Sequence, residues 1–437
     1  MGAVIDSIAV KNSTETYTLY LPTGFKQNEL SSIVFIFDPG ARGKIGIYPF
    51  IEAAEKYNYI LVCSNDSSNG TFEDNFNTIN RLFSTVFDSY NIDENRIYTA
   101  GFSGGSRLAT AVAVLTKQIE GVIACGAGFS PNNSHTPMSK ENFSYVGLVG
   151  DRDMNYQEMF EVMDWLNNFQ IDNEIFTYDG DHSWPPSEQI VRAFEWLEIQ
   201  AYKKRIKRKD ENLLNESFKN NYKTAKLLES NNQFEHSVWE YERIKRNYSR
   251  YYKLDSINLK IKRLKESSIY KDETKIRLII KEDEAKIRKI FADRFRKELA
   301  AKKNPSNYKW WIKELEKFND NYLKSTDYQY EKMGERIRYA LYAMAVETAT
   351  IQLRENNIKK ALYCHGLVAI LIPERPYPYY LLAKDYALLN EDEKVFENLE
   401  IAISKGLTNK DLLLKTEEFM KYRKIERFEL LLGSINK

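Results

Sequence analysis

The feature that most constrains the fold is an abrupt change in hydrophobic periodicity near residue 205. Before it, short runs of β-branched and aromatic residues alternate with helical segments, and after it strand-like runs almost disappear. Alternating strands and helices indicate a mostly parallel sheet that is covered on both faces. Apolar residues at helical spacing alone indicate an all-α region. The sequence therefore predicts two domains, residues 1–204 with an α/β fold and residues 205–437 with an all-helical fold.

The expected strands of the first domain are short and apolar. Residues 32–38, Ser-Ile-Val-Phe-Ile-Phe-Asp, form a nearly continuous apolar run, which is typical of a strand buried on both faces. The expected strands are 5–10, 17–21, 32–38, 59–64, 96–100, 121–125, 145–149 and 175–178, and the expected helices are 49–57, 72–90, 106–115, 156–169 and 187–202. In such sheets ligands bind at the carboxyl ends of the strands, so the chemistry is expected there.

One of these strand ends carries a candidate nucleophile. Residues 101–105, Gly-Phe-Ser-Gly-Gly, fit the pattern Gly-x-Ser-x-Gly between an expected strand and an expected helix. The chain must turn sharply there, and side chains at Gly101 and Gly105 would collide with the neighbouring strand and helix. The alternative is an ordinary turn serine, which would require strand, turn and helix to coincide by chance. The pattern therefore indicates Ser103 as a nucleophile.

A serine hydroxyl needs a base that takes its proton, and histidine is the usual one. The chain has four histidines. They are His135, His182, His236 and His365. Only His182 follows the last expected strand and precedes the last helix of the first domain, so it is the candidate general base.

The base in turn needs a carboxylate that orients its ring. The strand 145–149 runs into the turn Gly-Asp-Arg-Asp at 150–153, where both Asp151 and Asp153 are candidates. Either could instead be a turn residue that caps the next helix. The chain order Ser103, Asp153, His182 is that of α/β-hydrolases.

The tetrahedral intermediate needs two backbone N–H donors for its oxyanion. Gly104, the residue after the nucleophile, is the first candidate. The second is expected in the loop after strand 32–38, where Pro39 has no N–H and Gly40, Ala41 and Arg42 are candidates.

These motifs, together with His-Ser-Trp-Pro at 182–185, make residues 4–204 resemble the esterase and polyhydroxybutyrate-depolymerase-like branch of the α/β-hydrolases. The resemblance implies an α/β-hydrolase fold, ester hydrolysis without a cofactor or metal, and Asp153 as the acid. It is specific for fold and triad, not for substrate. Where that branch often has His-Gly-x-Gly, this chain has Gly-Ala-Arg-Gly at 40–43, which leaves the second oxyanion donor open.

The second half carries a weak internal repeat. Ala361 and Pro373 lie twelve residues apart, and small and aromatic residues fall at the packing positions of the next repeat. A frame of about 34 residues is typical of tetratricopeptide repeats, which bind peptides or partner proteins. The resemblance is clearest at 342–409, and a helical bundle without repeats is the alternative. The basic cluster 203–209 is expected to be a solvated helix end.

Composition excludes several classes of function. The formal net charge is +1, so nothing in it favours nucleic acid as a partner. Three scattered cysteines give no disulfide framework or metal-ligand spacing. We expect no membrane span and no basic, apolar leader at the start, which leaves the compartment open between the cytoplasm and export with a removed signal peptide.

The leading hypothesis is a serine esterase that forms an acyl-enzyme. The segment between the sixth expected strand and residue 145 is too short for a lid, and an open site suits polymer-borne or bulky esters. The alternatives are a serine peptidase of the same fold, and a protein-binding helical scaffold with a relic hydrolase domain. In every case the helical half is a candidate for binding a protein partner.

Overall fold

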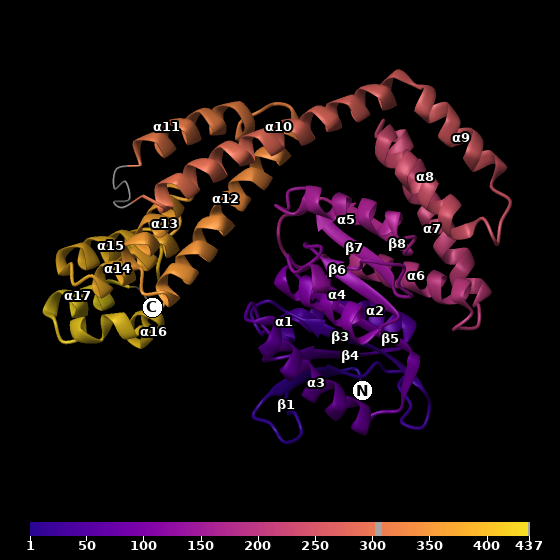
Figure 1. Ribbon diagram of the computed structural model, residues 1–437, viewed down its shortest axis with the longest axis horizontal. Coiled ribbons are helices and arrows are strands. Elements are labelled where there is room, and N and C mark those ends of the chain that lie inside the picture. Colours follow the sequence, from indigo (N-terminus) through magenta and orange to yellow (C-terminus); the bar gives the residue numbers. More distant parts are fainter. Residues whose placement is uncertain (302–307, 436–437) are drawn as a thin grey trace. The chain divides into compact units, whose positions relative to one another are not determined.

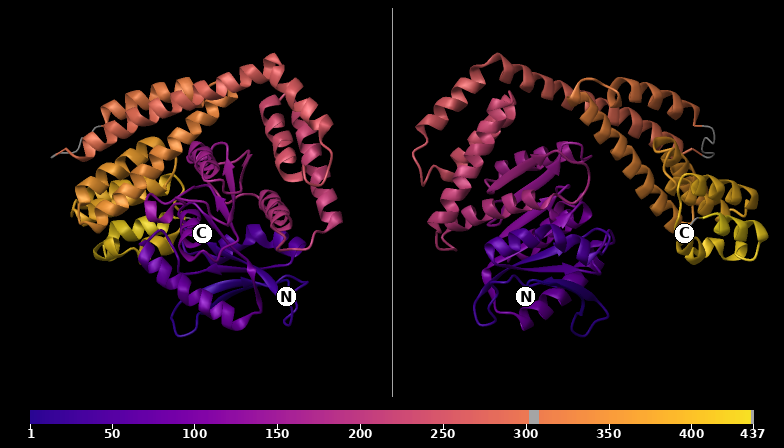
Figure 2. Two further views of the ribbon diagram at one scale, coloured as in Figure 1. Left: turned by 45° about the vertical axis from the view of Figure 1, so that its right-hand side comes forward. Right: turned by 180° about the vertical axis from the view of Figure 1, so that it is seen from behind.

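A computed structural model describes residues 1–301 and 308–435 of the chain. It divides into two compact units, Met1–Ile279 and Ile280–Lys437. The first unit holds an α/β sheet followed by helices, and the described part of the second contains helices and no strand (Figures 1 and 2). The predicted fold class, an α/β-hydrolase sheet followed by an all-helical region, is confirmed.

The sheet has eight strands in the order β1-β2-β4-β3-β5-β6-β7-β8. The first two pairings, β1 with β2 and β2 with β4, are antiparallel, and all others are parallel. The strands are β1 Val4–Ala9, β2 Thr16–Tyr20, β3 Ser31–Phe37, β4 Tyr59–Ser64, β5 Ile92–Phe102, β6 Gly121–Cys125, β7 Ser144–Gly150 and β8 Asn173–Tyr178. Every predicted strand is present, and β5 begins four residues earlier than expected.

Helices cover both faces of the sheet because its central strands are apolar on both sides. In β3, Phe35 belongs to the core on one face, and its neighbours Val34 and Ile36 belong to the core on the other. One face packs against α3 (Phe72–Ser89), α4 (Gly104–Thr116) and α5 (Tyr156–Asn168). The other packs against α1 (Gly43–Ile47), α2 (Ile51–Tyr57) and α6 (Ser187–Lys204).

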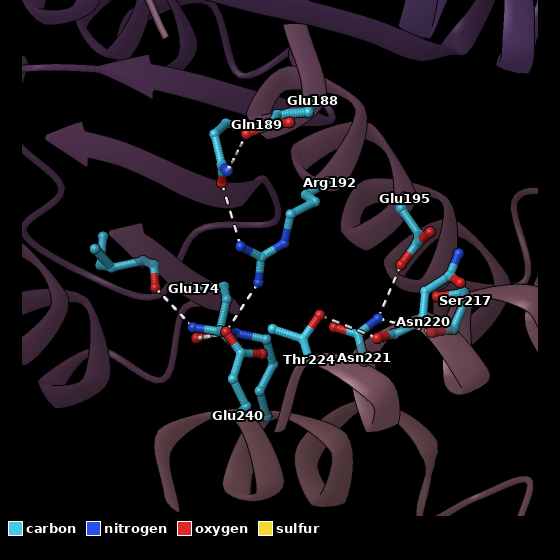
Figure 3. Close-up of polar contacts among 12 residues, drawn as sticks. Glu174, Glu188, Gln189, Arg192, Glu195, Ser217, Asn220, Asn221, Thr224 and Glu240 are labelled. Carbon is cyan, nitrogen blue, oxygen red and sulfur yellow. Dashed lines mark hydrogen bonds and ion pairs between the residues drawn. The ribbon is translucent and has the colours of Figure 1, made fainter. Parts of the chain in front are cut away.

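Three further helices belong to the same compact unit. They are α7 (Glu211–Ser230), α8 (Phe234–Tyr248) and α9 (Asp255–Glu266). Buried charges join α8 to the sheet and to α6, since Arg243 lies 3.2 Å from Glu174 of β8, and Glu240 lies 2.9 Å from Arg192 of α6 (Figure 3). The helical region thus starts where the sequence predicts, and whether residues 1–204 fold without it stays a prediction.

The basic cluster at 203–209 lies at a helix end, as predicted. Helix α6 ends at Lys204, and Arg205 caps it with a φ of 62°. Cations are favourable at a helix C-terminus. Several of these cations form ion pairs, for example Lys204 with Glu120 at 2.6 Å and Lys209 with Glu211 at 2.6 Å.

The second unit consists of packed helices. The long helix α10 (Ser268–Leu299) enters it from the first unit. The others are α11 (Lys309–Phe318), a π-helical turn (Asn319–Leu323), α12 (Tyr328–Arg354), α13 (Ile358–Leu371), α14 (Tyr377–Leu388), α15 (Asp392–Ser404), α16 (Lys410–Lys415), a 3₁₀ turn (Glu417–Tyr422) and α17 (Glu426–Ser434). Ala361, Ala383 and Ala402 are fully buried, as close helix packing requires. The tetratricopeptide assignment itself stays a prediction. No helix in the described part of the chain is long and apolar enough to cross a membrane.

Candidate active site

Ser103 lies at the sharp turn between β5 and α4. Its backbone has φ 53° and ψ −118°, a conformation that L-residues rarely adopt. A Cβ on Gly101 would lie 2.2 Å from the Gly105 carbonyl carbon, and a Cβ on Gly105 would lie 1.9 Å from the Phe37 carbonyl oxygen. Only glycine fits at either position, so the two motif glycines allow the elbow to pack directly against β3.

The structure brings Ser103, His182 and Asp153 into one hydrogen-bonded line. His182 Nε2 lies 3.0 Å from Ser103 Oγ, and His182 Nδ1 lies 2.9 Å from both carboxylate oxygens of Asp153. An ionised carboxylate can only accept, so Nδ1 carries the proton and Nε2 is left to accept from the serine hydroxyl. This is the arrangement that a general base needs before it takes the serine proton.

Two loops at the carboxyl edge of the sheet hold this line together. Asp153 follows β7, and His182 lies between β8 and α6. The loops pack backbone to backbone, since the Arg152 N–H donates to the Gly180 carbonyl at 2.9 Å. A Cβ on Gly150 would lie 2.3 Å from the same carbonyl oxygen, so glycine permits this close approach.

Asp153 pairs with the histidine through both of its carboxylate oxygens. The side chain of Asp153 is buried and accepts the Asn155 N–H at 2.7 Å besides its bonds to His182. Burial raises the pKa of Asp153, and the hydrogen bond and charge of His182 oppose that rise. Asp151 instead accepts the Gly180 N–H at 3.4 Å, the kind of turn role that the sequence left open for either aspartate.

The other three histidines have other neighbours in the structure. His135 is buried against Phe72, with ring centroids 4.5 Å apart, and burial lowers its pKa. His236 packs on Trp239 at 4.9 Å, and His365 lies 2.6 Å from Asp385 within the second unit.

Hydrogen bonds within the loop after β3 distinguish the candidate oxyanion donors from one another. The Gly40 N–H donates to the Asp38 side chain at 2.8 Å, and the Ala41 N–H donates to the Asp38 carbonyl at 3.1 Å. Within the described residues, hydrogen bonding leaves the N–H groups of Arg42 and Gly104 without an acceptor. The Ala41 N–H is thus engaged within its own loop, and the choice of second oxyanion donor stays a prediction.

Asp38 is the residue that the sequence analysis missed. Its carboxylate is buried, and besides Gly40 it accepts Arg42 Nε at 2.8 Å, Arg42 Nη2 at 3.0 Å and Trp184 Nε1 at 2.9 Å. Burial on its own raises the pKa of Asp38, but these hydrogen bonds outweigh burial and hold the pKa below its usual value. A carboxylate at the end of a fully buried strand was the available signal.

Aromatic rings pack beside the histidine. The Phe102 ring lies 4.7 Å from the His182 ring and 5.4 Å from that of Trp184. Among the described residues, no group of three or more His, Cys, Asp or Glu side chains is arranged to hold a metal ion.

Comparison with known proteins finds similarity in structure only. No protein-family model and no curated protein matches the sequence. The S-formylglutathione hydrolase from Staphylococcus aureus is 14% identical, matches 45% of this chain and 96% of its own, and has a TM-score of 0.37. An esterase from Pyrobaculum calidifontis is 13% identical over 46% of this chain and 86% of its own, with a TM-score of 0.38. The feruloyl esterase module from Clostridium thermocellum is 15% identical over 42% of this chain and 82% of its own, with a TM-score of 0.35.

Proposed function

We propose that this protein is a serine hydrolase that cleaves carboxylic esters through an acyl-enzyme. The observation that carries the proposal is the line Ser103–His182–Asp153, with contacts of 3.0 and 2.9 Å, at a strained elbow on the carboxyl edge of the sheet. Strained backbone that close packing enforces is typical of catalytic sites. The same edge carries two N–H groups suited to an oxyanion.

Each group has a defined part in the reaction. Ser103 Oγ attacks the acyl carbon while His182 Nε2 takes its proton, and Asp153 stabilises the imidazolium that forms. The N–H groups of Gly104 and Arg42 hold the oxyanion of the tetrahedral intermediate. His182 then gives the proton to the departing alcohol, and a water molecule, activated by the same base, releases the acid from Ser103.

We further propose that the helical unit serves binding rather than chemistry. The whole line lies within residues 103–182, so nothing in residues 280–437 is needed to complete it. Stacked helical hairpins are suited to binding a partner protein or positioning a large substrate, such as a polymer-borne ester.

Hydrolysis of a panel of nitrophenyl esters and chromogenic peptides, by wild type and by Ser103→Ala, tests the function. We expect ester hydrolysis by wild type and none above background by the variant. Cleavage of the peptides alone would support a peptidase of the same fold. No turnover by wild type would support a scaffold with a relic site.

A further inference from the structure

The side chain of Asp38 connects two loops of the candidate site, residues 39–43 after β3 (the oxyanion loop) and residues 181–186 before α6 (the histidine loop). It is fully buried at the end of β3, and its two oxygens accept four hydrogen bonds of 2.8–3.0 Å. Three come from the oxyanion loop, from the Gly40 N–H and the Arg42 guanidinium. The fourth comes from Trp184 in the histidine loop, 146 residues away in the sequence.

Each donor belongs to a segment that the reaction needs. Arg42 supplies the candidate backbone donor, and the bidentate grip on its guanidinium fixes where that backbone lies. Trp184 comes two residues after His182, and its ring packs on Phe102, which in turn contacts the His182 ring. One carboxylate thus connects the oxyanion donor to the general base.

Stability of the fold alone does not require a charged side chain at position 38. Burying a carboxylate is unfavourable unless hydrogen bonds and an opposite charge compensate for lost hydration. Apolar side chains fill the neighbouring positions of β3, and replacing a buried ion pair by apolar residues is often neutral or stabilising. The geometry of all four donors fits a carboxylate, and the side chain of Arg42 is about half exposed.

We propose that Asp38 is a positioning residue, which holds the oxyanion loop and the histidine loop in the relative position required for catalysis. The proposal rests on the serine hydrolase function proposed above. Asp38 touches no reacting atom, and it acts through Arg42 on one side and Trp184 on the other.

The first test compares Asp38→Asn and Trp184→Phe with wild type. Trp184→Phe keeps an aromatic ring and removes the N–H donor together with part of the indole, so it serves even if Asp38→Asn does not fold. We expect kcat to fall about 10- to 100-fold in each, with KM changed less than about threefold, since oxyanion donors act mainly in the transition state. Binding of a trifluoromethyl ketone, which mimics the tetrahedral intermediate, should weaken by the same factor as kcat/KM.

Trp165→Phe is the matched control. The Trp165 indole also donates one hydrogen bond, to the Pro137 carbonyl at 2.7 Å, and its ring packs on Phe169. We expect its kcat to stay within about twofold of wild type. If Trp184→Phe and Asp38→Asn lower only the melting temperature and leave kcat and ketone affinity unchanged, the positioning role is overturned.

Hydrogen exchange provides a readout that does not depend on turnover. In Trp184→Phe and Asp38→Asn we expect faster exchange in residues 39–43 and also in residues 181–186, with unchanged exchange in α5. Unchanged exchange in either loop would overturn the connection. A wild type without hydrolysis would contradict the proposed function, and the exchange data would still decide whether Asp38 joins the two loops.

Discussion

At the scale of single residues, the account depends on a few side chains that packing holds in unusual states. Ser103 has a positive φ, and Asp153 and Asp38 are buried carboxyls. Each is explained by a neighbour: glycines that admit the elbow, a histidine that pairs with Asp153, and four N–H donors around Asp38. Small changes at these positions therefore have large expected effects.

The acid can be tested by amide substitution. Asp153→Asn should lower kcat by about four orders of magnitude, because an amide favours the wrong tautomer of His182. Asp151→Asn is the matched control and should lower kcat less than about tenfold, since Asp151 accepts the Gly180 N–H while Asp153 accepts His182 Nδ1. Steady-state kinetics on one activated ester decide the ranking, and the reverse order would move the acid to Asp151.

The elbow can be tested by adding one methyl group. In Gly105→Ala the new Cβ would lie 1.9 Å from the Phe37 carbonyl, so either β3 or the elbow must shift. We expect at least about a hundredfold loss of kcat/KM and a lower melting temperature. Gly433→Ala, where no atom lies within 4 Å of the new Cβ, should change neither by much. A fully active Gly105→Ala protein would show that the elbow is not rigid.

For helices and strands, the hydrophobic pattern predicts the elements whose side chains are buried in a regular alternation. It does not predict polar strand ends or contacts between residues that are distant in the sequence. Strands β3 and β4 are recognisable because nearly every side chain in them is buried. The start of β5 is not, because Glu94 and Asn95 are exposed and polar within the strand. The elbow, the acid turn and the histidine are also readable from local motifs. The role of Asp38 is not, since its partner Trp184 is distant in the sequence.

The ion pairs that join α8 to α6 and β8 are expected to make the stability of the fold depend on pH. Burial opposes ionisation of Glu240, but Arg243 and Arg192 outweigh it and lower the pKa of Glu240 from about 4.5 to about 2. A carboxyl with a lowered pKa stabilises the fold above its unfolded pKa, and that contribution is lost as the pH falls toward 2. The arginines make this joint a source of acid sensitivity.

Glu240→Gln tests this joint by urea unfolding at several pH values. We expect a loss of roughly 3 kcal/mol at pH 7, because two arginines lose a buried partner. The difference from wild type should shrink below about pH 4.5 and vanish near pH 2. Glu216→Gln removes an exposed pair with Lys56 and should lose less than about 1 kcal/mol. A difference for Glu240→Gln that does not depend on pH would contradict the electrostatic account.

In the molecule as a whole, the second unit contributes no residue to the candidate site described above. The candidate triad, both candidate oxyanion donors and Asp38 all lie before residue 205, and the compact unit that contains them ends at Ile279. Sequence alone could place the change to helices but not the end of the compact unit, because α8 is joined to α6 and β8 by charged and apolar contacts between residues that are distant in the sequence.

Truncation tests this division. A chain ending at Ile279 should hydrolyse a small activated ester at a rate within a few fold of the full protein. A chain ending at Lys204 should retain measurable activity but melt roughly 5–10 °C lower, because Glu174 and Arg192 lose their partners on α8. If the chain ending at Ile279 is folded but inactive, the second unit forms part of the active site.

The central claim is that Ser103 is an activated nucleophile, and covalent capture tests it most directly. A fluorophosphonate reacts with a serine only when a base has activated it, and peptide mass spectrometry locates the adduct. We predict one phosphonylated residue, Ser103, in wild type, strongly reduced labelling in His182→Ala and none in Ser103→Ala. Absence of labelling in folded wild type, or an adduct on another residue that persists in Ser103→Ala, would contradict the account.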